Sequence, residues 1–187
     1  MGEVLVREST IEDEHLAGAA AALIDLVASE NDIARRTPAW LARKIAAGRA
    51  ALALAEPPAG GNTRELVGFG YWSAWEDNRY VSHSGLVVHP DFRGRGLGRR
   101  LKEVLFASTR RQLPEATMMS LTTSPRVKRL NESFGFRVVP LDELTQDPAF
   151  WRGCETCRNF EEVRARGERC CCEGMILPPG EGPGGRA

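Results

Sequence analysis

At 187 residues, the chain is long enough for one domain with a full hydrophobic core and a modest appendage. Hydrophobic residues make up 42% of it and charged residues 27%, which is ordinary for a soluble globular protein. The formal net charge is zero, so the chain creates no overall field that would attract nucleic acid or an acidic membrane surface, and we expect neither as a partner. No uncharged apolar run is long enough for a transmembrane helix and the N-terminus lacks an apolar signal core, so we expect a cytoplasmic protein without an export signal.

Hydrophobic periodicity and helix-capping patterns predict a chain that mixes short strands with helices. Ser9 and Glu12 form a capping-box pattern at the start of a first helix, which we expect to run to about Ser29. Thr37 is typical of an N-cap and Pro38 of a first helical position, so a second helix follows. In chain order, the predicted elements are strand 3–7, helix 9–29, helix 38–47, strand 50–55, loop 57–62, strands 66–75 and 80–88, helix 97–112, strand 117–122, a helix within 124–134, strand 136–139 and strand 175–177.

The predicted helix over 97–112 is amphipathic. Its apolar stripe predicts a buried face made of Leu97, Leu101, Val104, Leu105 and Ser108. We expect its basic residues to stay solvated; these are Arg99, Arg100, Lys102, Arg110 and Arg111.

Residues 86–98, LVVHPDFRGRGLG, place a glycine-rich turn between an apolar strand and this helix. Pro90 ends the strand because proline cannot donate to a sheet ladder. Glycines have no Cβ, so the backbone can come close to a ligand, and successive N–H groups at a helix N-terminus form an anion-binding concavity. The expected pyrophosphate cradle consists of Arg93, Gly94, Arg95, Gly96 and Gly98. A plain surface turn rich in Arg and Gly is the alternative.

The glycine spacing differs from those of the two best-known phosphate loops. No Lys-Ser or Lys-Thr pair follows the glycines, and their pattern is G-x-G-x-G instead of G-x-G-x-x-G. The segment resembles the acyl-CoA signature of the GNAT superfamily of N-acetyltransferases, [RQ]-x-x-G-x-[GA], through Arg93, Gly96 and Gly98. The preceding V-x-P-x-[FY]-R-G pattern is matched by Val88 to Gly94.

The resemblance implies an α/β (α+β) fold with a mixed, mostly antiparallel central sheet, splayed between strands four and five and covered by helices on both faces. The predicted strand and helix order is the usual opening of that fold. It also implies acetyl-CoA as cosubstrate. The residues expected to contact it are the strand backbone of Leu86, Val87 and Val88, the cradle, and Leu97 and Arg99 of the helix. The N–H of Val88 would polarise the thioester carbonyl.

Residues 124–136 resemble a second landmark of the superfamily, of the form N-x-x-A-x-x-L-Y-x-x-x-G-F, which ends here in Gly135 and Phe136. Asn131 stands where the family often has a tyrosine that protonates the departing CoA thiolate. An amide cannot deliver that proton, although it can hydrogen-bond to the thioester or the pantetheine arm. We therefore expect Asn131 either to contact the cofactor or to be a helix-surface amide.

The general base is not marked by any motif. Ser82 occupies the position where a carboxylate often lies in proteins that this chain resembles. The candidates are His83, whose intrinsic pKa suits a base near neutrality, and Glu76; proton loss through water is the other option. Strand alternation places His83 on the face opposite Ser82.

All cysteines lie between residues 154 and 172, which indicates a local metal site in a reducing compartment. Cys154, Cys157, Cys170 and Cys172 form two close pairs that suit a structural zinc ion, with Cys171 facing the other way. Spacing alone does not decide between Cys170 and Cys171 as ligand, and redox-active, iron–sulfur or unliganded cysteines remain alternatives. The pattern faintly resembles a bacterial GNAT subgroup with such a tail. The expected organisation is a core at 1–140, a cysteine-rich insertion with the last strand at 141–177, and a disordered tail at 178–187.

These features favour an N-acetyltransferase that moves an acetyl group from acetyl-CoA to the primary amine of a small or amino-acid-like acceptor by direct attack in a ternary complex. Two alternatives use the same scaffold: a catalytically weak acyl-CoA-binding regulatory module, and a thiol redox or metal-responsive protein. The acceptor and the oligomeric state, a homodimer among the options, are left open.

Overall fold

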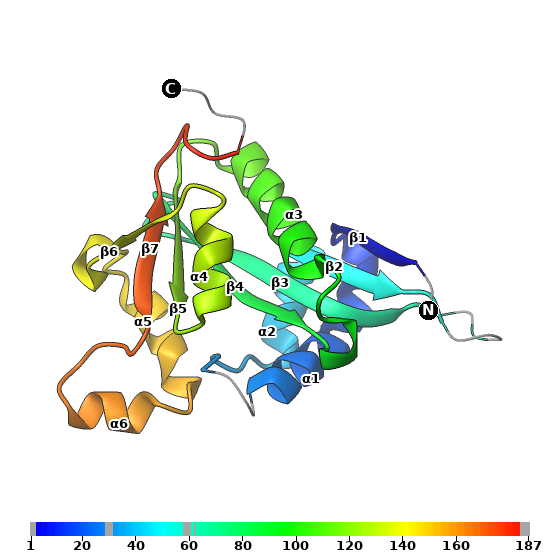
Figure 1. Cartoon of the computed structure of the whole chain (residues 1–187), viewed down its shortest axis with the longest axis horizontal. Coiled ribbons are helices and arrows are strands. Elements are labelled where there is room, and N and C mark those ends of the chain that lie inside the picture. Colours follow the sequence, from blue (N-terminus) through cyan, green and yellow to red (C-terminus); the bar gives the residue numbers. More distant parts are fainter. Residues whose placement is uncertain (1–2, 29–31, 58–60, 62, 184–187) are drawn as a thin grey trace.

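The computed structural model describes residues 3–28, 32–57, 61 and 63–183. They form one seven-stranded sheet in the order β1-β2-β3-β4-β5-β7-β6, with helices on both faces (Figure 1). Neighbouring strands are antiparallel except for the β4–β5 pair, which is parallel. The expected mixed, mostly antiparallel sheet is confirmed.

The bounds of the elements follow the predicted order closely. They are β1 (Val4–Glu8), α1 (Ala17–Ala28), α2 (Pro38–Ala46), β2 (Ala50–Ala55), β3 (Glu65–Trp75), β4 (Tyr80–Val88), α3 (Leu97–Gln112), β5 (Thr117–Thr122), α4 (Pro125–Glu132), β6 (Arg137–Val139), α5 (Pro148–Arg152), α6 (Phe160–Ala165) and β7 (Glu173–Leu177). A 3-10 helix, Ile11–Leu16, leads into α1. No helix among these described residues is long and apolar enough to cross a membrane.

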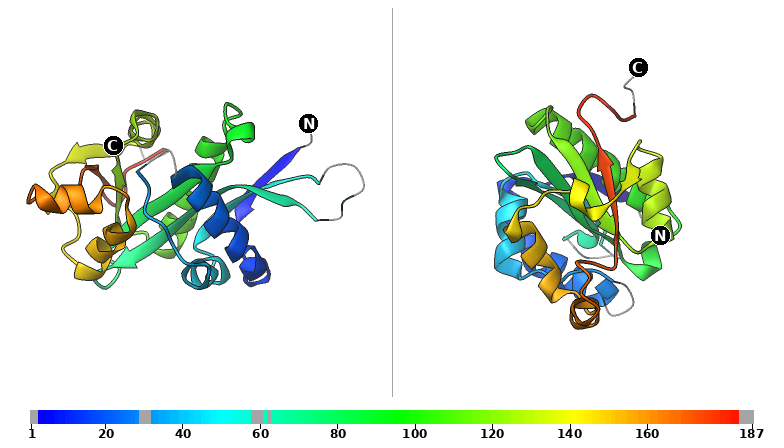
Figure 2. Two further views of the ribbon diagram at one scale, coloured as in Figure 1. Left: turned by 90° about the horizontal axis from the view of Figure 1, so that it is seen from below. Right: turned by 90° about the vertical axis from the view of Figure 1, so that its left-hand side faces the viewer.

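Helices α1 and α2 cover one face of the sheet, and α3 and α4 cover the other (Figures 1 and 2). Strand β2 lies between the two layers, and all its residues are buried. Small alanine side chains suit this position because both faces of the strand meet helices. The core therefore divides into a cluster under α1 and α2, centred on Leu41, Ile45 and Phe69, and a cluster under α3.

The β4–β5 pair is short, and this opens the sheet. Its register runs from Tyr80 opposite Thr117 to Ser82 opposite Met119, and no pairing between the two strands continues beyond this point in the described chain. Strand β4 is irregular opposite Tyr71, and Gly85 there has a φ of +62°. The last residues of β4 thus leave β5, which confirms the expected splay.

The cysteine-rich segment lies between β6 and β7, as predicted, and β7 pairs with β5. Its helices α5 and α6 lie on the same side of the molecule as α1 and α2 (Figure 2). The segment is tied to the link between α1 and α2 by side-chain contacts. Arg158 Nε lies 2.8 Å from an Asp32 oxygen, and Arg36 Nη1 donates to the Gly153 carbonyl at 3.0 Å. Thr156 Oγ1 also donates to the Arg35 carbonyl.

Two predictions about side chains of the helices were wrong: the residues that cap the first helix and the exposure of Lys102. The capping box is formed by Thr10 and Asp13, one residue beyond the predicted pair, because Asp13 also forms a two-pronged ion pair with Arg7 of β1. Lys102 of α3 was expected in solvent, yet it is 2% exposed.

Three predicted segments lie partly outside the described residues: the end of the first helix, the loop over 57–62 and the C-terminal tail. Ser29 and most of the predicted loop over 57–62 lie outside the described residues. In the predicted tail, the carbonyls of Pro178 and Glu181 accept hydrogen bonds from Arg110, and residues 184–187 lie outside the described part.

Replacing Gly85 with alanine should destabilise the fold. A Cβ at Gly85 would lie 2.6 Å from Tyr71 Cε1, and the left-handed backbone adds strain, so we expect a loss of about 2–3 kcal/mol in thermal or chemical unfolding. Gly18→Ala in α1 is the matched control, because no atom lies within 4 Å of the added Cβ. The control should be neutral or slightly stabilising. A Gly85→Ala protein as stable as wild type would contradict this account of the bulge.

Candidate functional site

Three adjoining cavities run through the splay from the glycine-rich turn to the cysteines. The outer cavity, about 550 Å³, shares Leu86, Ser124 and Val127 with a central cavity of about 350 Å³. The central cavity shares His83, Ser84 and Gly85 with an inner cavity of about 180 Å³. Each shares lining residues with the next, so the three lie in a row along the splay, and we call this row the channel. We call them the outer, central and inner cavities.

The outer cavity contains the predicted cradle. Its lining includes Leu86, Val87, Val88, Arg93, Gly94, Gly96, Leu97, Gly98 and Arg99. Gly94 and Gly96 have φ values of +80° and +73°, a conformation that residues with a Cβ rarely adopt. Gly96 is the N-cap of α3, so the first N–H groups of this 16-residue helix point at the cavity.

The arginines of the cradle are held in place by local contacts. Arg93 Nε donates to the Val88 carbonyl at 3.2 Å, and the Arg95 guanidinium lies over the Phe92 ring at 5.0 Å. Arg95 is not among the residues that line the outer cavity. Arg99 donates to Ser133 at 3.0 Å and lines the cavity. A positive rim on a set of helix N–H groups suits a pyrophosphate.

The central cavity brings together three buried polar side chains from different elements. His83 comes from β4, Lys102 from α3 and Asn131 from α4. His83 Nε2 lies 3.0 Å from Thr109 Oγ1, while its Nδ1 has no hydrogen-bond partner in the described structure. Asn131 is fully buried, so it is not a helix-surface amide. Its Nδ2 lies 3.5 Å from Met175 Sδ and its Oδ1 has no partner among the described residues.

Burial controls the protonation of this group. It lowers the pKa of Lys102 to about 7, and among the described residues Lys102 Nζ has no carboxylate partner; it lies 4.3 Å from the centre of the Phe136 ring. Burial also lowers the pKa of His83 well below 6.5, and the charges of Lys102 and Arg110 add to this effect. His83 is therefore neutral at pH 7, and Lys102 is poised between its two forms.

Glu76 does not join this group. Its carboxylate accepts hydrogen bonds from Thr145 Oγ1 at 2.6 Å and from the Gln146 N–H at 2.7 Å, and these bonds lower its pKa. It lies outside the linings of all three cavities. Through these hydrogen bonds, Glu76 links the start of the insertion to the β3–β4 turn.

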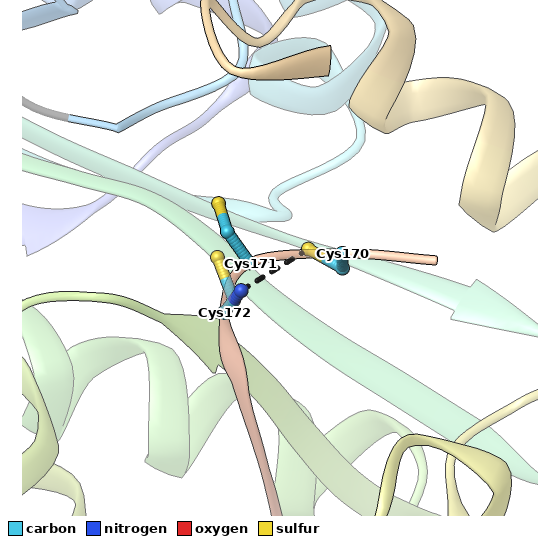
Figure 3. Close-up of side chains that lie close together, drawn as sticks. All are labelled: Cys170, Cys171 and Cys172. Carbon is cyan, nitrogen blue, oxygen red and sulfur yellow. Dashed lines mark hydrogen bonds between the residues drawn. The ribbon is translucent and has the colours of Figure 1, made fainter. Parts of the chain in front are cut away.

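The cysteines gather at the end of the inner cavity. The sulfur atoms of Cys170, Cys171 and Cys172 lie within 4.8 Å of one another (Figure 3). We predicted that Cys171 faces away from Cys170 and Cys172, and this prediction was wrong. Residues 170–172 precede β7 and are not extended, so neighbouring side chains need not point to opposite sides. The Cys172 N–H donates to Cys170 Sγ at 3.4 Å, and thiol hydrogen bonds from Cys154 and Cys172 lower the pKa of Cys170.

The predicted metal ligands lie around one cavity, although the sulfur atoms grouped within 4.8 Å in the described chain are those of Cys170, Cys171 and Cys172. Cys154, Cys157, Cys170 and Cys172 line the inner cavity. Asn159 Nδ2 donates to Cys171 Sγ at 3.4 Å. Thiol groups that point at one another, together with N–H donors aimed at sulfur, form a donor set that fits a thiolate-bound zinc ion.

Aromatic side chains form the other walls of the inner cavity. Trp40 packs edge-on against Tyr71 with ring centres 4.9 Å apart, and Trp75 packs against Phe150 at 5.4 Å. Arg36, from the link between α1 and α2, lines the same cavity and places a cation there. The volume and lining suit a small molecule with an apolar body and an anionic group.

Sequence reasoning missed Lys102. The stripe of leucines on α3 predicted one buried face, and lysine is usually solvated. The available signal was the spacing from Lys102 to Thr109, since residues two helical turns apart share a face and Thr109 is also buried.

Comparison with known proteins agrees with this geometry. Residues 52–138, from β2 to β6, match the family model described as an acetyltransferase (GNAT) domain. The match includes the cradle and ends before the cysteines. No curated protein sequence matches the chain.

Solved structures show the fold. N-acetylglutamate synthase from Neisseria gonorrhoeae, complexed with coenzyme A and N-acetyl-glutamate, has 17% identity and a TM-score of 0.63; the match covers 96% of this chain and 36% of that one. This chain therefore spans little more than a third of that enzyme.

Two other structures match over nearly their whole length. Phosphinothricin acetyltransferase from Sinorhizobium meliloti, in complex with acetyl-CoA, has 17% identity and a TM-score of 0.60, covering 98% and 92% of the two chains. Diaminobutyrate acetyltransferase from Paenibacillus lautus, with L-2,4-diaminobutyric acid and coenzyme A, has 13% identity and a TM-score of 0.60, covering 96% of each chain. The protein has the GNAT fold.

Replacing Lys102 with methionine should stabilise the protein at pH 7. The unfolded lysine binds its proton up to about pH 10.5, whereas the native one releases it near pH 7, so wild-type stability falls as the pH drops from about 10.5 to 7. Each pKa unit of the shift corresponds to about 1.4 kcal/mol, so the gain at pH 7 should reach a few kcal/mol and shrink toward pH 10.

The measurement is the free energy of unfolding against pH. Lys128→Met is the control, because Lys128 lies on the surface and its Nζ is 2.8 Å from Glu173. Removing that ion pair should give no gain. A Lys102→Met protein that is less stable than wild type at pH 7 and equal to it at pH 10 would contradict the assignment.

Proposed function

We propose that the protein transfers the acetyl group of acetyl-CoA to the primary amine of a small, amino-acid-like acceptor. The observation that carries this proposal is the row of three adjoining cavities from the glycine-rich N-terminus of α3, through the splay, to an aromatic inner cavity. A pyrophosphate, a narrow pantetheine arm and a small acceptor need these three spaces in this order.

The cofactor would be held mainly by backbone groups. The pyrophosphate accepts hydrogen bonds from the N–H groups that begin α3, with Arg93 and Arg99 at the rim. The pantetheine arm lies along the edge of β4 that faces the splay, at Leu86 to Val88. Since that edge has no β5 partner in the described structure, its N–H and C=O groups can bond to the amides of the arm.

The reaction is a direct attack. The acceptor nitrogen bonds to the carbonyl carbon while the N–H of Val88 polarises the carbonyl oxygen, and the C–S bond breaks. His83 is better placed than Glu76 to receive the amine proton, directly or through water, because it lines both the central and the inner cavity and is neutral at pH 7. Its lowered pKa makes it a weak base, which favours a water between the two.

The inner cavity supports an amino-acid-like acceptor. Its aromatic walls pack against an apolar stem, and the Arg36 guanidinium suits a carboxylate. The diaminobutyrate acetyltransferase with the same fold carries L-2,4-diaminobutyric acid in its structure. An acceptor with an amine at one end and a carboxylate at the other would bridge His83 and Arg36.

We also propose that Cys154, Cys157, Cys170 and Cys172 hold one structural zinc ion. The ion would join the two parts of the insertion and so fix the wall of the inner cavity. Zinc bound by four thiolates has no open coordination position, so its role here is to hold structure.

Gly96→Val should abolish cofactor binding, and it should also strain the backbone because Gly96 has a φ of +73°. No atom lies within 4 Å of the added Cβ, but the side chain would occupy the space where a pyrophosphate meets the helix, so we expect the Kd for CoA to rise at least about 100-fold in calorimetry. Gly167→Val is the matched control, since Gly167 has a φ of +70°, an equally open surrounding and a position outside the cavities. Equal CoA binding by both variants would contradict the cradle.

Turnover is tested by mixing the protein with acetyl-CoA and a panel of amino acids and diamines, with the release of free thiol recorded. We expect acceptors that carry both an amine and a carboxylate to react, and Arg36→Met to raise their KM without changing the Kd for CoA. Tight CoA binding with no turnover across the panel would instead favour the regulatory module.

The zinc proposal predicts about one zinc per chain by elemental analysis after purification without added metal. Cys154→Ser and Cys170→Ser should lose most of the metal, and Cys171→Ser should keep it. If Cys171→Ser loses the zinc and Cys170→Ser keeps it, Cys171 is the ligand in place of Cys170. No zinc together with reversible disulfides would contradict the structural-metal proposal.

A further inference from the structure

We infer that Lys102 is the proton donor to the departing thiolate of coenzyme A, in place of the tyrosine that this chain lacks. The inference rests on the proposed function, because it assigns a residue to a step of that reaction. It is carried by the position of Lys102 in the lining of the central cavity, which Asn131 also lines.

Lys102 reaches the cavity from a buried place in α3. The side chain is 2% exposed, its Nζ lies over the Phe136 ring, and it has no carboxylate partner among the described residues. A buried lysine without a carboxylate destabilises the fold. Such a cost is typical of functional sites, where the missing partner is the ligand.

Few other groups on this cavity can give a proton at neutral pH. Asp32, His83 and Lys102 are the titratable residues in its lining. Although burial opposes it, hydrogen bonds from Thr123, Arg158 and Asn159 lower the pKa of Asp32, so Asp32 is ionised. His83 is neutral. Lys102 alone among the three carries a proton whose release falls near pH 7.

None of the described groups around Lys102 takes its proton. His83 faces it from β4, and Arg110 of its own helix acts on His83. Ser120 and Thr122 from β5 and Asn131 from α4 line the same cavity and do not titrate. Phe136, ahead of β6, contributes only its ring. The departing thiolate of CoA is thus the natural acceptor of the proton.

The step balances. The acceptor nitrogen forms the N–C bond, and the C–S bond breaks with its electron pair on sulfur. The Lys102 ammonium gives one proton to sulfur and becomes a neutral amine. The proton that the new amide nitrogen loses passes through the cavity and restores the ammonium. Because an ordinary thiol has a pKa of about 8.5, transfer from a group that titrates near 7 is downhill.

The first test needs no acceptor. The ultraviolet absorbance of the thiolate is titrated in the complex with CoA, with the desulfo-CoA complex subtracted to remove the protein cysteines. Because Lys102 and the thiol titrate as a coupled pair, wild type should show a partial thiolate step near pH 7 that Lys102→Met lacks. Lys102→Arg stays charged throughout and should lower the whole thiol titration. Equal titrations in wild type and Lys102→Met, or loss of CoA binding in Lys102→Met, would overturn the inference.

The second test is the pH profile of turnover. Wild-type kcat should fall as the pH rises through the pKa of Lys102, because the protonated form is active. Lys102→Met and Lys102→Arg should lower kcat about 100-fold or more, keep the KM for acetyl-CoA, and lack that fall. Lys128→Met should behave as wild type.

The outcomes separate this inference from the function beneath it. If wild type binds CoA and acetylates an amine while Lys102→Met matches it, only the inference fails. A pH limb that is lost in Tyr71→Phe and kept in Lys102→Met would assign the donor to Tyr71. If wild type neither binds CoA nor releases thiol, the proposed function itself fails.

Discussion

The hydrogen bonds between β4 and β5 stop at Ser82, and the geometry of the site depends on this early end. Two parallel strands normally pair along their shared length, and each unpaired backbone group in a protein interior has a cost. Gly85 makes the departure possible because a Cβ there would meet Tyr71. The edge of β4 therefore lines a channel, with helix N–H groups at one end and aromatic rings at the other.

The sheet must be held together by other means on the far side of the channel. Strand β7 pairs with β5 along five residues, and the insertion that precedes it contacts the α1–α2 link through Arg158 and Arg36. The walls of the inner cavity thus come from segments far apart in the chain. The zinc ion that we propose would lock the same insertion, beside the inner cavity that we propose for the acceptor.

Much of this was predictable because it is local. Apolar runs and caps predicted β2, β4, α3 and β5 with the bounds that the structure has, and the glycine-rich turn lies between β4 and α3 where it was predicted. Features set by long-range packing were not. Asp13 caps the first helix because Arg7 of β1 reaches it, and Asn131 is buried because Met175 of β7 covers it. Periodicity treats any lysine as solvated, so it could not place Lys102 inside.

The buried polar atoms without partners share one location. His83 Nδ1, Asn131 Oδ1 and Ser73 Oγ all lie on the central or inner cavity, and Lys102 joins them there without a counter-ion in the described structure. Packing faults would be scattered through a core of this size, and each would cost stability. Their convergence on a single channel indicates groups kept for a ligand. Under the proposed function, the lysine that weakens the fold at neutral pH and the amide at the position of the family's tyrosine would be two parts of one arrangement, in which α3 supplies the proton.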